Sequence, residues 1–294
     1  MDLKKYGLWT VALDLQPAPQ ARDAAAEIES LGWGAIWIPE AVNREVMSNS
    51  MLLLGATERL TVATGIANLH ARTAMTMSAG HKTVTAAHPD RFLLGIGVSH
   101  QVAVEGFFGQ TYDKPLTTMR TYLDTMDKGL FFAAPPPVEP TRVLAALGPK
   151  MLELARDRAA GAHPYFVPIE HTPVAREILG AGKLLCPEKA VVLEADAEKA
   201  RAVARMHMQT YLGLPNYTNN LKRLGWTDDD IANGGSDALV DAVVAWGSTD
   251  EVVKQLEAHH DAGADHVAIQ VLTDDPRALP MAQWRELASA LGLS

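Results

Sequence analysis

Cysteine is almost missing from this chain of 294 residues, in which Cys186 is the only one. A single cysteine excludes a disulfide bond within the chain and is typical of a reducing, cytoplasmic environment. No apolar run approaches the roughly 18 residues that a membrane-spanning helix needs. The N-terminal residues also lack the apolar stretch and the cleavage site of a signal peptide. We therefore expect a cytoplasmic protein with no membrane partner.

Lysine and arginine are also fewer than aspartate and glutamate. The chain has 26 lysines and arginines against 35 aspartates and glutamates, which gives a formal net charge of −9. This acidic balance argues against a nucleic acid or an anionic membrane as the partner. Aromatic residues make up only 6% of the chain, but 48% of all residues are hydrophobic, so a large core can still form.

What the chain does have is a regular alternation of strand-like and helix-like segments. The strand-like segments are mostly continuous apolar runs, as in strands that are covered on both faces. The helix-like segments carry end signals: one is alanine-rich and stops at Gly32, and another opens with a Ser248–Glu251 capping box and stops at Gly263. The eight predicted strands cover residues 6–13, 35–38, 60–67, 91–98, 142–147, 162–168, 189–195 and 265–272.

This alternation predicts a (β/α)8 TIM barrel, formed as a single domain over residues 1–294. Two segments are longer than a simple strand–helix repeat requires. Residues 99–141 end in the proline-rich stretch "AAPPPVEP", and residues 197–247 should hold two or three helices. Long insertions in a barrel usually lie at the C-terminal ends of the strands, which is the active-site face. We expect these two segments to form walls or a lid there.

The common motifs for nucleotide and metal binding are incomplete. The "GIG" at 95–97 would need a third glycine where His100 stands, and the "GAGKLL" at 180–185 lacks the spacing of a phosphate-binding loop. His259 and His260 are neighbours on a predicted helix and diverge by about 100°, so we interpret them, together with His266, as a solvated helix face. No metal site is predicted.

A more informative segment begins where a predicted strand passes into a helix through Gly148 and Pro149. The free backbone N–H groups at a helix start, with Lys150 beside them, can bind an anion such as a phosphate group. The alternative is an ordinary turn with a solvated lysine, and these residues alone do not decide between the two. His163 and Tyr165 follow at the end of the next strand, where a barrel carries site residues.

Polar residues also gather at the ends of three early strands. Parallel strands bring these ends to one mouth of a barrel, so we expect a site there, although each residue alone could be structural. Within the third strand, Gly65 interrupts the pattern, as glycine does where something must lie close against the backbone. The polar residues at the three strand ends are Glu40, Asn68, His70, Ser99 and His100.

Several segments together resemble one protein family in order and spacing. Residues from about 6 to 275 resemble the bacterial-luciferase-like oxidoreductases, and most of all the actinobacterial branch that uses the deazaflavin coenzyme F420. The resemblance implies an oxidoreductase built on a TIM barrel, and it also implies a homodimer. The segments that carry it are "TGIANLHAR" (64–72), "HPDRFLLGIGVSH" (88–100), "GPKML" (148–152), "GAHPY" (161–165) and "AGADHVAIQ" (262–270).

The same resemblance implies how the cofactor is held. In relatives that use the deazaflavin, the third strand carries a bulge with a cis peptide bond that lies against the cofactor ring, and the matching bond is Gly65–Ile66. Asn68 matches a position at the ring edge, and the turn at Gly148 matches the phosphate site. The implied cofactor-binding residues are Gly65, Ile66, Ala67, Asn68, Ser99, Gly148, Pro149, Lys150, Met151, His163, Pro164 and Tyr165.

The chain departs from the family's sugar-phosphate dehydrogenases at two positions. Those enzymes have a proton-donating glutamate where this chain has His100, and a catalytic Asp-His pair where it has Pro39-Glu40. The acid and base types are thus exchanged between the two positions. The exchange puts sugar-phosphate oxidation in doubt and leaves proton transfer possible.

We predict hydride transfer between F420 and a small organic substrate, with His100 as general acid or base because imidazole titrates near neutrality. Glu40 would orient His100 or contact the substrate, while Trp9 and His70 would line the substrate pocket. The reaction is the reduction of an activated C=C or C=O bond, or the reverse oxidation of an alcohol.

Two alternatives remain open from the sequence. An FMN-dependent monooxygenase could use the same barrel and the same phosphate site. A non-catalytic protein could bind the cofactor as a carrier or store, with His100 only structural. No motif defines the substrate.

Overall fold

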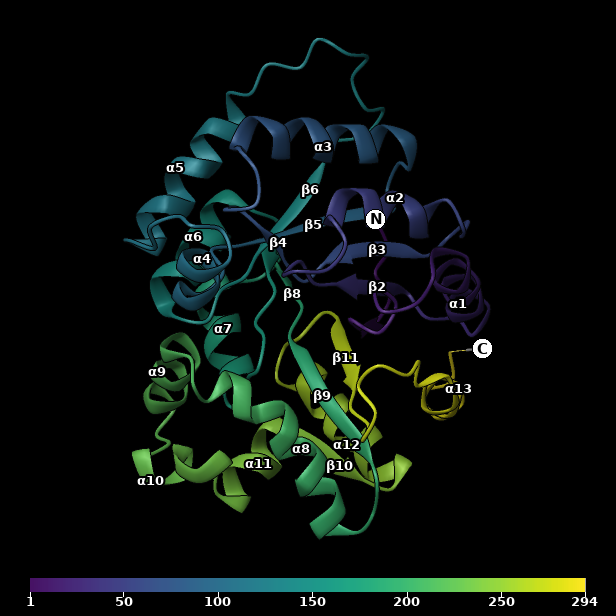
Figure 1. Cartoon of the computed structure of the whole chain (residues 1–294), viewed down its shortest axis with the longest axis vertical. Helices are drawn as coiled ribbons and strands as arrows, with labels where there is room; N and C mark the ends of the chain where they lie inside the picture. The colour runs from purple at the N-terminus through teal and green to yellow at the C-terminus, as the bar shows by residue number, and fades with distance from the viewer. Residues whose placement is uncertain (294) are drawn as a thin grey trace.

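The centre of the molecule is one curled sheet of parallel strands, with helices packed around it (Figure 1). The computed structural model describes residues 1–293. Within them the strands are β1 Tyr6–Trp9, β2 Ala35–Ile38, β3 Thr61–Thr64, β4 Ala67–Asn68, β5 Phe92–Gly97, β6 Thr141–Leu144, β7 Gly161–Ala162, β8 Leu184–Leu185, β9 Glu188–Leu193, β10 Val244–Gly247 and β11 Val267–Val271.

The helices connect successive strands and cover the outer face of the sheet. They are α1 Ala18–Ser30, α2 Val46–Leu54, α3 Ala74–Ala87, α4 Gln101–Gly106, α5 Pro115–Asp127, α6 Pro149–Arg158, α7 His171–Leu179, α8 Ala197–Tyr211, α9 Pro215–Arg223, α10 Asp228–Ile231, the 3-10 turn η1 Ala232–Gly234, α11 Asp237–Val243, α12 Thr249–Asp261 and α13 Met281–Ala290. None of the described helices is long and apolar enough to cross a membrane.

The strand order shows an α/β fold that departs from a regular (β/α)8 barrel. Along the sheet the order is β10-β9-β11-β1-β2-β3-β5-β6-β7-β8, and β4 pairs with β5. The chain runs from β8, at one end of this path, into β9 across Cys186 and Pro187. The sheet is therefore curled back on itself, while β10 lies outside β9 instead of between β9 and β11. The structure therefore shows a curled parallel sheet with two strands, β8 and β10, beyond the eight predicted, and a regular eight-stranded barrel stays an expectation.

Several predicted strands are shorter than expected. The first ends at Trp9, and the sixth, expected over 162–168, pairs only at Gly161–Ala162 before the chain leaves the sheet. The third is split into β3 and β4 at Gly65 and Ile66, where the sequence pattern is interrupted. The short strands β8 and β10 were not predicted, because two to four residues are too few to show a period.

The helix-end signals are confirmed. Helix α1 stops at Ser30 and Gly32 follows with φ +87°, a conformation that glycine adopts without strain. Helix α12 carries the Ser248–Glu251 capping box and ends at Asp261.

The two long segments interrupt the alternation of strands and helices. Residues 99–141 contain α4, α5 and an extended connection that projects from the top of the view in Figure 1. Residues 197–247 contain α8, α9, α10, η1, α11 and β10. The second segment therefore holds more than the two or three helices predicted, and it includes a strand of the sheet.

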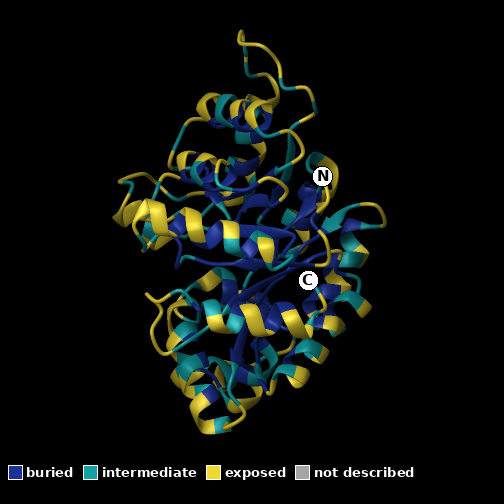
Figure 2. Ribbon diagram, turned by 90° about the vertical axis from the view of Figure 1, so that its right-hand side faces the viewer, coloured by how far each residue is buried: buried dark blue, intermediate teal, exposed yellow. Residues whose placement is uncertain are grey.

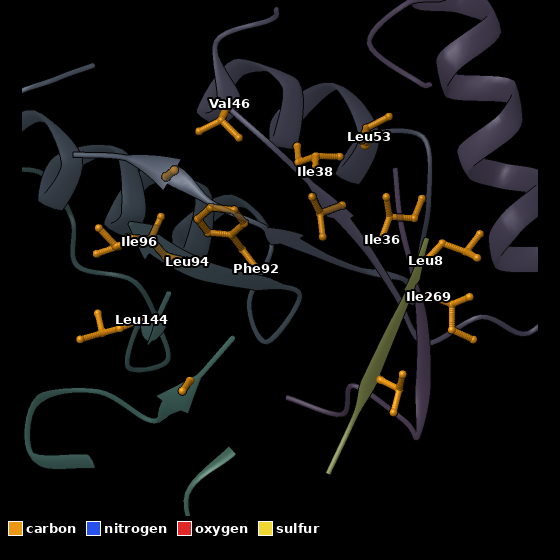
Figure 3. Packing of buried hydrophobic residues seen from close by; sticks show 14 of the residues in the cluster. Leu8, Ile36, Ile38, Val46, Leu53, Phe92, Leu94, Ile96, Leu144 and Ile269 are labelled. Carbon is orange, nitrogen blue, oxygen red and sulfur yellow. The ribbon is translucent and has the colours of Figure 1, made fainter. Parts of the chain in front are cut away.

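Packing on the two faces of the sheet explains the continuous apolar strands. In Figure 2 the strands are dark blue, whereas the outward sides of the helices are exposed. On the outer face, side chains such as Leu8, Ile38 and Phe92 lie among those of the surrounding helices (Figure 3). On the inner face, Trp37 stacks on His163 with ring centroids 4.2 Å apart. Its indole N–H donates to His266 Nε2 at 2.9 Å, so aromatic and imidazole rings fill the interior below the strand ends.

A buried ion pair fixes the chain after β2 to the chain after β4. Arg72 donates to both carboxylate oxygens of Glu40, and the two side chains are only 8% and 6% exposed. The same carboxylate accepts the backbone N–H groups of Val46 at 3.2 Å and Asn68 at 2.8 Å. Glu40 therefore joins the start of α2 to β4 and holds the rim on which the site is built.

The interpretation of His259, His260 and His266 as a solvated face is wrong for two of the three. His259 and His266 are fully or almost fully buried, and His259 Nδ1 lies 2.9 Å from Thr172 Oγ1. Helical spacing places His259 on the inner side of α12, while His266 precedes β11 and enters the interior of the sheet. Burial lowers the pKa of nine histidines, among them His163, His207 and His266 to about 4 and His81 and His259 to about 3.

These neutral histidines predict a loss of stability in acid. Each takes up a proton below its ordinary pKa of about 6.5 only when the chain unfolds, so the free energy of unfolding should fall between about pH 6.5 and 4. Each contributes up to about 1.4 kcal/mol per pH unit. Burial raises the pKa of Glu188 to about 7 and also raises that of Asp14, which acts in the opposite direction, but the histidines are more numerous. Urea denaturation across this range tests the prediction, and a stability that rises as the pH falls would contradict it.

The Glu40–Arg72 pair gives a second prediction. Arg72→Met should lower the free energy of unfolding by about 3–5 kcal/mol, because it leaves a carboxylate buried without its partner. Arg59→Met is the matched control, since Arg59 is 73% exposed and lies 3.9 Å from Glu29; it should cost less than about 1 kcal/mol. Equal losses in the two variants, measured by denaturant titration, would show that the buried pair has no special role.

Candidate functional site

A cavity of about 430 Å³ opens at the C-terminal ends of the strands, within the size range of small-molecule sites. Its walls come from the ends of β1, β2, β3 and β5, from the turns after β6 and β7, and from both long segments. The expected convergence of strand ends at one mouth is confirmed for most of the residues concerned. The predicted site residues that line the cavity are Trp9, Glu40, Gly65, Ile66, Asn68, Ser99, His100, Met151, His163 and Tyr165.

Six predicted residues do not line this cavity: Ala67, His70, Gly148, Pro149, Lys150 and Pro164. The expectation that His70 lines the substrate pocket is wrong. Its Nδ1 lies 3.1 Å from Gln110 Oε1, and the Gln110 amide donates back to its carbonyl oxygen at 2.8 Å. His70 therefore ties the chain after β4 to the loop after α4.

Gly65 forms part of the cavity floor, and its backbone lies close against the rings of Trp9 and His163. The peptide bond Gly65–Ile66 is cis, as the family resemblance implied. Trp9 Nε1 donates to Gly65 O at 3.1 Å. A Cβ atom on residue 65 would lie 2.5 Å from Trp9 Nε1 and 3.0 Å from His163 Nε2. Only glycine fits between these rings without displacing them.

Two buried polar atoms on this floor have no partner within the described chain. Asn68 Oδ1 accepts the N–H of His70 at 2.9 Å, but Asn68 Nδ2 is unpaired. His163 Nδ1 lies 2.6 Å from the carbonyl oxygen of Cys186 and must donate to it, so Nε2 carries the lone pair and is also unpaired. A donor and an acceptor are thus available to a flat polar ring, and buried groups of this kind are normally satisfied.

His100 stands at the start of α4, where Ser99 adopts a left-handed conformation with φ +59°. Its Nδ1 lies 3.1 Å from Asn216 Oδ1. Burial lowers the pKa of His100, and the hydrogen bond to Asn216 partly offsets that effect. The imidazole is therefore neutral at pH 7, and its Nε2 is available on the cavity side.

The suggestion that Glu40 orients His100 is wrong. Both oxygens of Glu40 are occupied by Arg72 and by backbone N–H groups, and its role at the rim is structural. The orienting group is Asn216 on α9, in a segment whose sequence indicated only a break between helices. The spacing of 116 residues between the two partners left no sequence signal.

The same segment supplies an aromatic wall that sequence reasoning missed. Tyr211 ends α8 and Tyr217 lies on α9, and both line the cavity. The hydroxyl of Tyr165 lies 2.8 Å from that of Tyr211 and 2.9 Å from Gln270 Oε1. Burial raises the pKa of all three tyrosines, so they are neutral hydrogen-bonding groups.

An anion-binding position lies next to the cavity at the start of α6. Gly148 precedes the helix without any side-chain cap, Pro149 has no N–H group, and Met151 donates its N–H to Gly148 O at 3.1 Å, so the N–H of Lys150 is the one left uncapped in the first turn. A Cβ atom on Gly148 would lie 3.2 Å from Arg223 Nη2, which shows how near that guanidinium is. Arg223 donates to Asn220 Oδ1 at 3.1 Å and has no carboxylate partner in the part of the chain described. The cation beside this turn is thus Arg223 on α9 in addition to Lys150, which is exposed.

Comparison with known proteins finds relatives both by sequence and by structure. A protein of Mycobacterium tuberculosis named as a coenzyme F420-dependent oxidoreductase is 24% identical, over 90% of this chain and 94% of that protein. An F420-dependent secondary alcohol dehydrogenase, solved with an F420–acetone adduct, superposes with a TM-score of 0.78 at 12% identity, over 99% of both chains. The oxygenating constituent of 3,6-diketocamphane monooxygenase from Pseudomonas putida, solved with FMN, superposes with a TM-score of 0.66 at 18% identity, over 98% of this chain and 97% of that one.

At these identities the structural matches show the fold alone. The family is shown by the sequence itself, because the model of the luciferase-like monooxygenases matches residues 6–266, which is most of the chain. The curled parallel sheet, the cavity at its C-terminal end and the bulge at Gly65 are consistent with that match. This chain belongs to the luciferase-like monooxygenase family.

Proposed function

We propose that this protein is an F420-dependent oxidoreductase that transfers a hydride between the deazaflavin and a small organic substrate. The observation that carries the proposal is the cavity lined by Gly65 and Ile66, whose floor offers an unpaired donor at Asn68 and an unpaired acceptor at His163. The F420-dependent proteins among the matches support the choice of cofactor.

The residues present fit such a cofactor. Ile66 would support the ring, while Asn68 Nδ2 and His163 Nε2 would hydrogen-bond its polar edge. The N-terminus of α6 and Arg223 would hold the phosphate group, since both backbone N–H groups and a guanidinium favour phosphate. When bound, the deazaflavin supplies or accepts the hydride.

The proton that accompanies the hydride is handled by His100. Because Nδ1 donates to Asn216, Nε2 of the neutral ring carries the lone pair. Nε2 can therefore accept the proton of an alcohol, and once protonated it can donate to a carbonyl oxygen. A positioned acid or base of this kind contributes about 10²- to 10⁴-fold to a rate.

The proposal includes three expectations from the sequence. The curled sheet acts as a closed barrel, residues 1–294 form one domain, and the protein is a homodimer. An FMN-dependent monooxygenase is the second candidate, because one structural match holds FMN and the position beside Gly148 suits either cofactor's phosphate.

Cofactor binding tests the choice between the two. The protein should bind F420 more tightly than FMN in fluorescence-quenching titrations, and Arg223→Gln should weaken F420 binding by about 10- to 100-fold, the value of one charged hydrogen bond. Lys222→Gln is the matched control, because Lys222 lies next to it on α9 and pairs with Asp228. Tighter binding of FMN would favour the monooxygenase.

Substitution of His100 tests the chemistry. His100→Gln should reduce turnover by about 10²- to 10⁴-fold and change F420 affinity by no more than a few-fold. Turnover is followed by F420 fluorescence in a screen of alcohols, aldehydes, enones and quinones. A variant with nearly full turnover would show that His100 only lines the cavity.

The pH profile has a definite sign in each direction of reaction. Alcohol oxidation needs neutral imidazole, so its rate should rise with pH through a midpoint below 6.5 and then level off. Carbonyl reduction needs the protonated ring and should fall through the same midpoint. In Asn216→Leu the hydrogen bond that raises the pKa is lost, so the midpoint should move further down.

A further inference from the structure

We infer that the substrate is uncharged and largely apolar, with one reactive oxygen function held at His100 and a hydrocarbon portion that passes out over an apolar rim. This inference rests on the proposed function, because it names the substrate class of the same site. It is carried by three features of the cavity: its lack of free charge, its exposed apolar rim and its small number of unpaired polar groups.

The cavity offers no free charge to a substrate. No lysine or arginine lines it among the residues described, and the only carboxylate in the lining, Glu40, is already paired with Arg72. Arg223 lies beside Gly148 at the position proposed for the cofactor phosphate. A carboxylate or phosphate on the substrate would therefore lose its hydration without gaining an ion-pair partner, which costs several kcal/mol.

The rim is apolar and exposed. Val42, just after β2, and Phe107, at the end of α4, both line the cavity, yet each is 67% exposed. Phe108 and Pro115 continue the same wall. Large apolar side chains exposed around the mouth of a cavity mark a surface that an apolar ligand covers.

The polar groups of the wall are few and partly paired with one another, as in the Tyr165 and Tyr211 hydroxyls, which lie 2.8 Å apart. His100 and Asn216 form a hydrogen-bonded pair at the inner end of the wall, and the Tyr112 hydroxyl lies 3.5 Å from the carbonyl oxygen of Ser99 beside them. The two unpaired atoms on the floor, at Asn68 and His163, are assigned to the cofactor ring. One oxygen function of the substrate can be satisfied here, whereas a polyhydroxylated sugar would leave most of its hydroxyl groups without partners.

A homologous series of substrates measures how much the hydrocarbon portion contributes to kcat/KM. In the series of methyl ketones from acetone to 2-decanone, with the matching secondary alcohols for the reverse reaction, kcat/KM should rise about fourfold per methylene until the chain passes the rim. An ω-carboxylate on a ketone of the same length should lower kcat/KM at least tenfold. A flat series, or a preference for the carboxylated ketones, would overturn the inference.

Two variants, one on α4 and one at its end, test where the hydrocarbon portion of the substrate lies. Phe107→Ser should flatten the upper part of the series by removing apolar surface at the rim. Val102→Ser is the matched control, because Val102 is 68% exposed on α4 but does not line the cavity, so the wild-type series should persist. A Phe107→Ser series identical to the wild-type one would place the hydrocarbon portion elsewhere and overturn the inference.

Calorimetric titration of the same ketones, and of decanoate, into the protein separates this inference from the proposed function. Ketone affinity that rises with chain length, without any hydride transfer from reduced F420 to the ketones or from the matching alcohols to F420, would support the substrate class and contradict the proposed function. Hydride transfer confined to charged substrates would support the function and overturn the substrate class. Decanoate bound more tightly than 2-decanone would also overturn it.

Discussion

The missing side chain at position 65 is the constraint on which the site depends. Gly65 lies so close to Trp9 and His163 that any Cβ atom there would meet both rings. These rings belong to β1 and to the turn after β7, which are not neighbours in the sheet, and His163 stacks in turn on Trp37 of β2. One backbone contact therefore sets the distance between three parts of the sheet and defines the level of the cavity floor.

Above this floor, the chemistry comes from segments that the barrel itself does not require. The strands supply rigid positions for Asn68, Ser99 and the rings of the floor, whereas the wall that faces them comes from α4, α8 and α9. The pair of His100 and Asn216 spans the two contributions. Hydrogen bonding across the cavity fixes the imidazole tautomer, so the segment 197–247 acts on the reactivity of a residue that lies in another part of the sequence.

The sequence predicts the strands that are long and apolar, the helices with clear caps, and the strand ends that form the mouth. It does not predict β8 or β10, because such short strands exist only through pairing with neighbours. It misplaces His259 and His266, since a histidine next to polar residues looks solvated until its buried partners are known. Asn216 and Arg223 escape notice for the same reason: their partners at His100 and Gly148 are at least 75 positions away in the chain.

Side chains fill the interior of the sheet below the cavity, and this bears on the order in which two ligands could bind and leave. Trp37, His163 and His266 occupy the space under the floor, and their contacts with one another leave the C-terminal face as the side on which ligands are exchanged. A ring that lies on the floor is then beneath whatever binds at His100. With the cofactor on the floor, as proposed, the deeper ligand would be the first to bind and the last to leave.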